Sequence, residues 1–232
     1  MMFFGGLQKT TLVDYPGKVA ATLFTLGCNF RCPYCHNPEL VLPELIKNQP
    51  KISQKDVLEF LEERKNLLEG ICLTGGEPLI HKEIKDFIKT VKAMGYLIKL
   101  DTNGSFPDIL ENLIEEKLID YVAMDIKGPK KKYEFFLFDS VPLANIEKSV
   151  KILKKGRVDY EFRTTLAPEI LDEKDIIDLV NWIKPARRYF LQNFQAKKNV
   201  NPEFQKKKPW ERERAEALII KIKSSFNFCA LR

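Results

Sequence analysis

An alternation of strand-like and helix-like segments is the feature that most constrains the fold of this 232-residue chain. Short apolar runs rich in β-branched residues alternate with longer segments whose apolar residues recur at helical spacing. The expected strands span residues 19–26, 70–76, 96–104, 121–128, 159–168 and 188–195, and the expected helices span 54–70, 81–95, 106–118, 143–156, 172–184 and 210–226. Parallel strands that follow one another need a crossover, usually helical, so this order predicts a parallel sheet covered by helices.

A single domain is expected. No Pro/Ser-rich linker and no abrupt change of composition interrupts the strand–helix units, so residues 1–232 are expected to fold together. The predicted fold class is α/β, a partial TIM-type (βα)6 barrel with parallel strands, and an open doubly wound sheet is the alternative. For the first helix, Ser53 is the expected N-cap and Gly70 the expected end.

Polar residues and glycines cluster where the expected strands end. These residues are Cys28, Gly75, Gly76, Glu77, Asp101, Thr102, Asn103, Gly104, Asp125, Lys127, Arg163, Thr164 and Gln192. The carboxyl ends of parallel strands form the functional face of barrels and of open α/β sheets. Segments that are far apart in the sequence are therefore expected to surround one cavity.

Three of the five cysteines, Cys28, Cys32 and Cys35, follow the first expected strand as C-x3-C-x2-C. Thiolates bind zinc, copper(I) or iron–sulfur clusters. A structural zinc site needs a fourth ligand. The candidates for it, all poorly placed, are His36, Cys72, His81 and Cys229. A 4Fe–4S cluster held by three cysteines instead keeps one iron free for a small molecule. The spacing alone leaves open a catalytic cluster and a zinc-stabilised, non-catalytic binding module.

Charge and hydropathy limit the expected partners. The net charge is +6, and short basic runs occur at Lys130–Lys132, Lys197–Lys198 and Lys206–Lys208. Such runs are typical of solvated surface, and the alternative is a docking surface for an acidic protein or a nucleic acid. No apolar run approaches the length of a membrane span, and the first residues lack the pattern of a signal peptide. The expected location is the cytoplasm, and neither a membrane nor a nucleic acid is the expected partner.

Two motifs together carry a family resemblance. The cysteine motif, with Tyr34 before its third cysteine, is followed by G-G-E-P at residues 75–78, and this pair resembles the radical S-adenosylmethionine superfamily. The string TTLVDYPGKVAATLFTLGCNFRCPYCHNPEL (residues 10–40) resembles activating enzymes of glycyl-radical enzymes, in particular those of anaerobic ribonucleotide reductase. The resemblance continues through D-T-N-G, M-D-I-K and L-Q-N-F to the last expected strand.

This resemblance implies a set of site residues. Cys28, Cys32 and Cys35 would ligate a 4Fe–4S cluster, whose free iron would bind the amino and carboxylate groups of S-adenosylmethionine. The implied cofactor-binding residues are Tyr34, Asn37, Gly75, Gly76, Glu77, Asp101, Asn103, Asp125, Lys127, Arg163 and Gln192. Within this set, Glu77 would meet the ammonium and Lys127 the carboxylate. Asp101 and Asp125 could form a monovalent-cation site.

The resemblance also implies a reaction and its partners. One electron delivered to the cluster would cleave the sulfonium into methionine and a 5′-deoxyadenosyl radical, which would abstract hydrogen from a backbone glycine. The implied partners are a glycyl-radical enzyme, namely anaerobic ribonucleotide reductase, and an electron donor of the flavodoxin or ferredoxin type. The alternatives are an activator of a pyruvate formate-lyase-like enzyme, or a radical enzyme that acts on a small molecule or a tRNA base.

Overall fold

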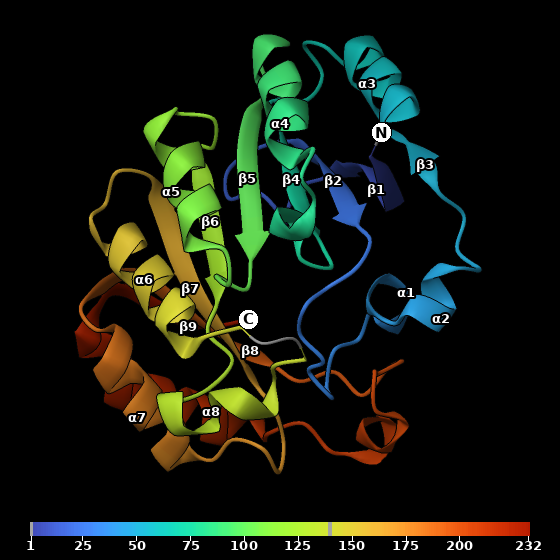
Figure 1. Cartoon of the computed structure of the whole chain (residues 1–232). Coiled ribbons are helices and arrows are strands. Elements are labelled where there is room, and N and C mark those ends of the chain that lie inside the picture. Colours follow the sequence, from blue (N-terminus) through green and yellow to red (C-terminus); the bar gives the residue numbers. More distant parts are fainter. Residues whose placement is uncertain (1, 139–140) are drawn as a thin grey trace.

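The computed structural model describes residues 2–138 and 141–232 (Figure 1). These residues contain one sheet with the strand order β3-β1-β2-β4-β5-β6-β7-β8-β9. The strands are β1 (Phe3–Thr11), β2 (Ala20–Thr25), β3 (Ile52–Ser53), β4 (Gly70–Gly75), β5 (Leu97–Thr102), β6 (Tyr121–Asp125), β7 (Asp159–Leu166), β8 (Ala186–Asn193) and β9 (Phe226–Leu231). Neighbours from β2 to β9 are parallel, whereas β1 is antiparallel to both β2 and β3.

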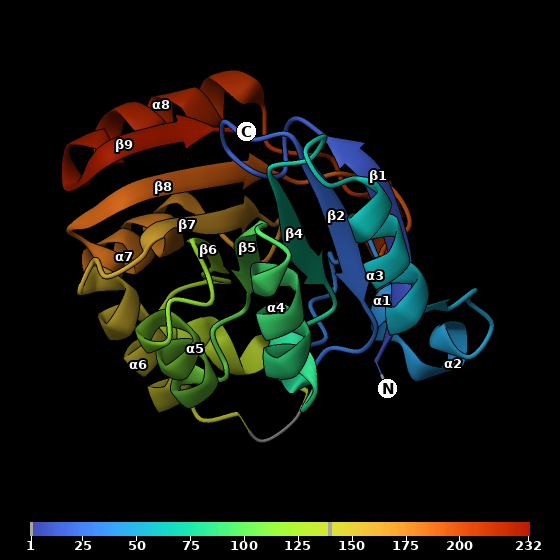
Figure 2. The same ribbon diagram turned by 90° about the horizontal axis from the view of Figure 1, so that it is seen from above.

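Helices cover the outside of this curved sheet (Figure 2). The longer ones are α3 (Gln54–Glu63), α4 (Ile84–Ala93), α5 (Pro107–Glu115), α6 (Leu143–Lys154), α7 (Glu173–Ile183) and α8 (Arg212–Ile222). The shorter turns are α1 (Pro38–Val41), α2 (Pro43–Ile46), η1 (Pro78–Ile80), η2 (Lys130–Phe135), η3 (Pro202–Lys206) and η4 (Lys223–Ser225). This arrangement confirms the predicted partial barrel and not the doubly wound alternative, which needs helices on both faces. In the described part of the chain, no helix combines the length and the apolar character that a membrane crossing requires.

The first long helix shows one confirmed prediction and one wrong one. Ser53 caps α3, since its hydroxyl accepts a hydrogen bond from the Asp56 amide at 3.2 Å. The helix ends at Glu63 and not at Gly70, which begins β4 between Ala20 of β2 and Leu97 of β5. A Cβ atom at Gly70 would lie 2.7 Å from the Leu97 carbonyl oxygen, so close packing of strands explains this glycine.

The prediction of six strands was incomplete. β9 extends the parallel part of the sheet, with α8 as its crossover, and the antiparallel strand β1 pairs with β2. The sequence of β1, FFGGLQKTT, contains two glycines and a polar second half, which hide the strand pattern. β9 is short and mixed in polarity, and only its pairing with β8 reveals it as a strand.

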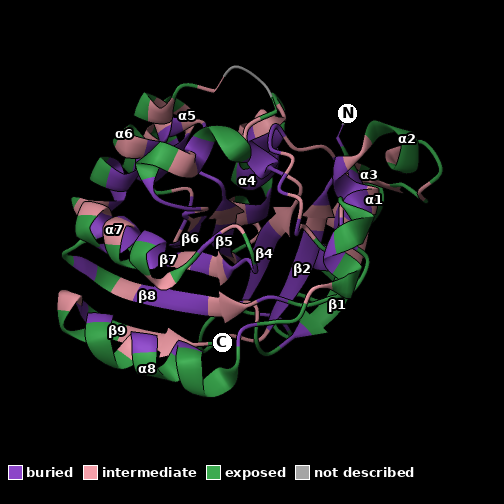
Figure 3. Ribbon diagram, turned by 90° about the horizontal axis from the view of Figure 1, so that it is seen from below, coloured by how far each residue is buried: buried purple, intermediate pink, exposed green. Residues whose placement is uncertain are grey.

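The two faces of the sheet differ in chemistry. Helix-facing residues such as Ile71, Leu73 and Phe162 are fully buried and apolar, and Figure 3 shows the central strands buried beneath helices with exposed outer faces. Successive side chains of a strand point to opposite faces. The intervening positions, among them Lys99 of β5 and Glu161 of β7, therefore place charged side chains inside the barrel.

Glu161 joins three strands from inside the barrel. Its carboxylate, which is fully buried, accepts hydrogen bonds from the Tyr121 hydroxyl of β6 at 2.7 Å and from Arg232, which follows β9, at 2.7 and 3.2 Å. The guanidinium of Arg232 also lies 3.4 Å from the ring centroid of Phe190 on β8. These contacts hold the last strand to the interior of the sheet.

We expect Arg232→Ala to lower the free energy of unfolding by about 2 kcal/mol, because the Glu161 carboxylate would stay buried without its counter-charge. The double variant Glu161→Gln/Arg232→Ala removes the unpaired charge and should recover part of this loss. Urea denaturation of the three proteins measures both values. An equal loss in the single and the double variant would contradict the proposed role of the ion pair.

Candidate active site

A cavity of about 450 Å³ lies at the carboxyl ends of the parallel strands. The structure brings every predicted site residue to its wall, namely Cys28, Cys32, Tyr34, Cys35, Asn37, Gly75, Gly76, Glu77, Asp101, Asn103, Asp125, Lys127, Arg163 and Gln192. Residues that were not predicted also line it, among them Asp14, Asn193 and Arg232. Asp14 and Arg232 lie outside the six strand ends used for the prediction, so no sequence signal marked them.

The three thiols share one wall of this cavity, in the loop after β2. Cys32 is buried and Cys28 and Cys35 are half-buried, and the Cys35 amide donates to the Cys32 carbonyl at 3.0 Å. Burial raises the pKa of Cys28 to about 12 and that of Cys32 to about 11. The chain itself thus provides too little positive charge to hold these sulfurs as thiolates, and a bound metal centre would supply it.

The donor set fits a cluster of several irons. Among the described residues, no three His, Cys, Asp or Glu side chains converge as the ligands of a single ion do. Thiolates that each bind a different iron of one cluster need not converge on one point. Three soft donors on one short loop, beside a cavity with room for a small molecule, have the chemistry that such a cluster requires.

Two other segments support the cysteine loop from behind. The amide of Arg31 donates to the Phe136 carbonyl at 3.0 Å, and the ring of Tyr34 packs edge-on against Phe136. On the other side, the amide of Val200 donates to the Cys35 carbonyl at 2.9 Å. The loop is therefore held on both sides by segments that are distant in the sequence.

Gly75 and Gly76 have a structural reason in addition to the predicted close approach of a ligand. Gly75 has a φ of +107°, which disfavours any residue with a Cβ atom. A Cβ atom at Gly76 would lie 1.8 Å from the carbonyl oxygen of Gly27, the residue before Cys28. That same oxygen accepts a hydrogen bond from the Glu77 amide at 2.8 Å. The glycines thus allow the end of β4 to pack directly on the cysteine loop.

Glu77 connects the end of β4 to the end of β5. One carboxylate oxygen accepts from the Thr102 hydroxyl at 2.8 Å and from the Leu79 amide at 3.1 Å, and the other accepts from the Asn103 amide at 2.7 Å. Burial raises the pKa of Glu77 to about 7, against the lowering effect of these donors. The carboxylate is thus engaged by the protein itself, and its predicted contact with an ammonium group stays a prediction.

Asn103 links this arrangement back to the cysteine loop. Its side-chain amide donates to the side-chain oxygen Oδ1 of Asn29 at 2.9 Å, while its own side-chain oxygen accepts from the Ser105 backbone amide at 2.9 Å. The second contact is the local turn that a D-T-N-G sequence favours. Asn103 therefore serves the turn and borders the cavity at the same time.

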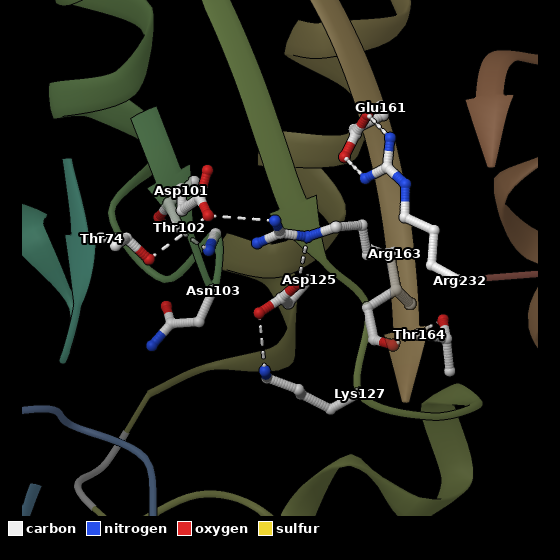
Figure 4. Close-up of polar contacts among 12 residues, drawn as sticks. Thr74, Asp101, Thr102, Asn103, Asp125, Lys127, Glu161, Arg163, Thr164 and Arg232 are labelled. Carbon is white, nitrogen blue, oxygen red and sulfur yellow. Dashed lines mark hydrogen bonds and ion pairs between the residues drawn. The ribbon is translucent and has the colours of Figure 1, made fainter. Parts of the chain in front are cut away.

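A network of charges occupies the ends of β5, β6 and β7 (Figure 4). The guanidinium of Arg163 donates to Asp125 at 2.9 Å and to Asp101 at 3.0 Å, and the Lys127 ammonium lies 3.0 Å from Asp125. Lys99, which is almost fully buried, pairs with Asp101. Burial alone would raise the pKa of Asp125, but the charges of Arg163 and Lys127 hold it well below its usual value.

This network bears on the suggested monovalent-cation site. Asp101 and Asp125 do lie together, as that suggestion requires, but the guanidinium of Arg163 lies between their carboxylates. Both acids are therefore neutralised by the protein's own cations, Lys99 and Lys127 included. A metal cation at these residues stays a prediction.

Gln192 and Asn37 both border the cavity. Gln192 is half-buried near the end of β8, opposite Thr165 of β7. Asn37 precedes α1 and makes no side-chain hydrogen bond to cap that helix. Both side chains thus have hydrogen-bonding capacity available, and their contacts with a cofactor stay predictions.

Comparison with known proteins identifies the family of this chain. The family model described as the radical SAM superfamily matches residues 22–183. A protein of Methanocaldococcus jannaschii that is assigned by name as a glycyl-radical enzyme activating enzyme is 35% identical over 209 residues, which cover 87% of this chain and 83% of that protein. A pyruvate formate-lyase-activating enzyme of Clostridium pasteurianum is 29% identical over 203 residues, covering 78% and 76% of the two chains. A 7-carboxy-7-deazaguanine synthase of Thermoplasma acidophilum is 29% identical over 150 residues, covering 64% and 66%.

Two solved structures share the fold. QueE from Escherichia coli superposes with a TM-score of 0.59 at 14% identity, over 100% of this chain and 93% of that chain. SuiB from Streptococcus suis, bound to S-adenosylmethionine, superposes with a TM-score of 0.66 at 16% identity, over 89% of this chain and 48% of that chain. The fold is thus the partial barrel of these proteins, with a thiol-bearing loop at its mouth.

The chain belongs to the radical SAM superfamily and is an enzyme of the type that activates glycyl-radical enzymes. Its cofactors are a 4Fe–4S cluster and S-adenosylmethionine. This family membership favours the catalytic cluster over the zinc-stabilised module that the cysteine spacing alone left open.

We expect Arg163→Gln to lower the free energy of unfolding by about 3 kcal/mol, because it leaves two buried carboxylates close to each other without their shared cation. Arg187→Gln is the matched control. Arg187 also pairs with an aspartate, Asp159, at 2.8 Å, but its side chain is 44% exposed against 12% for Arg163. The control should lose less than about 1 kcal/mol. Equal losses in urea denaturation would contradict the central place of Arg163.

Glu77 should give the free energy of unfolding a pH dependence. Its pKa is about 7 in the folded chain, against about 4.3 when unfolded. Between these values the folded state binds a proton that the unfolded state has released, so stability falls as the pH rises. The full effect amounts to about 4 kcal/mol. We expect Glu77→Gln to remove most of this dependence between pH 5 and pH 8, although the amide leaves one buried donor poorly paired.

Glu63→Gln provides the control for this experiment, because Glu63 is exposed at the end of α3. Urea denaturation of metal-free wild type and of both variants gives the unfolding free energy at each pH. The same pH dependence in all three proteins would show that the Glu77 carboxylate does not hold the extra proton.

Proposed function

We propose that this enzyme generates the glycyl radical of an anaerobic ribonucleotide reductase. The observation that carries the proposal is the similarity of most of the chain, at 35% identity, to a protein assigned as a glycyl-radical enzyme activating enzyme. The choice of reductase rests on the string at residues 10–40, which resembles the activators of that enzyme. We place the reaction in the cytoplasm, as the sequence predicts.

The shape of the cavity supports a macromolecular substrate. Phe24 of β2 and Arg232 beyond β9 line the same cavity, although the edge strands of the described sheet, β3 and β9, do not pair with each other. The barrel is therefore not closed by strand pairing on this side. A glycine on an extended loop of a partner needs such a lateral opening in order to reach the cofactor.

The chain's own residues would hold the cofactors in distinct ways. Cys28, Cys32 and Cys35 would hold the cluster, which, with S-adenosylmethionine, supplies a 5′-deoxyadenosyl radical after one-electron reduction. Lys127 would provide a positive charge for the carboxylate, and Glu77 would provide an acceptor for the ammonium. Asp125, which Arg163 keeps ionised, would orient Lys127 through their ion pair at 3.0 Å. The buried rings of Tyr34 and Phe194 exclude water from the cavity wall.

Electron paramagnetic resonance tests this function directly. The reconstituted and reduced enzyme, mixed without oxygen with S-adenosylmethionine and an anaerobic ribonucleotide reductase, should give the doublet of a glycyl radical. A reductase whose radical glycine is replaced by alanine serves as the control and should give none. A doublet that forms only with a pyruvate formate-lyase would favour the second activator, and no doublet with either partner would contradict the proposal.

A small-molecule substrate is the second candidate, favoured by the similarity to a 7-carboxy-7-deazaguanine synthase. An enzyme of that kind would form 5′-deoxyadenosine faster when its substrate is added, with no partner protein present. Chromatographic measurement of 5′-deoxyadenosine with a purine-like substrate, and separately with the reductase, distinguishes the two candidates.

A further inference from the structure

A lysine-rich stretch lies directly against the cysteine loop. We call residues 195–208 the lysine segment; it follows β8 and includes η3 (Figure 1). The amide of Val200 donates to the Cys35 carbonyl at 2.9 Å, and that of Asn201 donates to the Pro33 carbonyl at 3.0 Å. The side chain of Asn199 donates to the Tyr34 carbonyl at 3.0 Å. The segment thus forms the outer cover of the loop whose cysteines would hold the cluster.

The charge of the lysine segment is concentrated and largely unpaired. It contains five lysines and one glutamate in a chain whose total net charge is +6. Lys206 pairs with Glu203 and Lys207 pairs with Glu169. Lys197, Lys198 and Lys208 are exposed, and among the described residues no carboxylate pairs with them.

The other basic run beside the cysteine loop is different. Lys130 pairs with Glu147, Lys131 with Asp178, and Lys132 with Asp175. The charges of this run are thus neutralised within the fold. Of the two basic segments beside the cysteine loop, the lysine segment is therefore the one with unpaired positive charge that a partner could meet.

The position of these charges limits what the partner can be. Gln195, at the start of the segment, lines the cavity, whereas the lysines of the segment are not among the described residues that line it. A protein docked on the lysines would lie outside the cluster and leave the cavity free for a substrate. Stacking of nucleic-acid bases is not supported, because Phe204, the aromatic residue of the segment, is buried.

We propose that the lysine segment is the docking surface for a small acidic electron-carrier protein that reduces the cluster. The carrier loses one electron and the cluster gains it, with no bond formed and no proton transferred. Unpaired lysines steer an acidic surface toward the backbone that supports Cys35. The inference rests on the proposed function only in that the cluster must be reduced, and it does not depend on which enzyme receives the glycyl radical.

A charge-reversal variant tests this surface. In Lys197→Glu/Lys198→Glu, the formation of 5′-deoxyadenosine driven by reduced flavodoxin should fall about tenfold at low ionic strength. The rate with dithionite and a small viologen dye should stay at the wild-type value, because a small reductant needs no docking. In the wild type, the flavodoxin-driven rate should fall as salt is added, and in the variant this dependence should weaken.

The matched control is Lys9→Glu/Lys151→Glu. Both lysines are exposed and form no ion pair with a described residue. Lys9 lies in the half of β1 that runs beside the start of β2, away from the cysteine loop, and Lys151 lies on the outer helix α6. This control changes the net charge by the same amount and should keep the flavodoxin-driven rate.

Cross-linking gives a readout that is independent of activity. A carbodiimide joins lysines to carboxylates in contact, and mass spectrometry should locate the links between flavodoxin and this protein at Lys197, Lys198 or Lys208. Links elsewhere, or equal flavodoxin-driven rates in the two double variants, would overturn the proposal. A variant that cleaves S-adenosylmethionine with both reductants but fails to form the glycyl radical would assign the lysines to the radical-accepting enzyme instead. Activity with dithionite shows that the site is intact, whatever the outcome with a glycyl-radical partner.

Discussion

The geometry of the site depends on one interaction, the pairing of the Arg163 guanidinium with both Asp101 and Asp125. The three residues come from β5, β6 and β7, and the parallel register places Asp125 directly beside Arg163. A shift of any one of these three strands by one residue would turn its charged side chain to the helix-covered face. The buried charges therefore specify the register of three strands, and the same register sets the positions of Lys127 and Thr102 at the cavity.

The polar interior explains how a small barrel can keep a cavity at its mouth. Apolar burial comes mostly from the outer face of the sheet, against the helices, so the interior does not have to be filled with aliphatic side chains. At the amino end of the strands the barrel is plugged by a separate small cluster that includes Tyr15, Tyr121 and Ala123. The charged side chains inside the barrel pair with other protein groups: Lys99 with Asp101, and Glu161 with Arg232.

Features that depend on residues close together in the chain were predicted correctly from the sequence. The strand–helix alternation, the cap at Ser53 and the gathering of the predicted site residues around one cavity all follow from short-range signals. Gly70 was misinterpreted because a glycine that ends a helix and one that packs between strands look alike in sequence. β9 was missed, and with it the position of Arg232 at the cavity, since only pairing with β8 and the distant Glu161 define them. Contacts between segments far apart in the chain have no local signal.

The structure also gives a physical reason why the cysteine loop, G-G-E-P and D-T-N-G occur together in one chain. Gly27 accepts a hydrogen bond from the Glu77 amide, the Glu77 carboxylate accepts one from the Asn103 amide, and the Asn103 side chain donates to Asn29, two residues beyond Gly27. This closed circuit of hydrogen bonds joins the ends of β2, β4 and β5. A change in any one motif would leave a buried donor or acceptor of another unpaired, at a cost of about 1–3 kcal/mol for each group. The three motifs are therefore one structural unit, which sets the position of the thiols relative to the rest of the cavity.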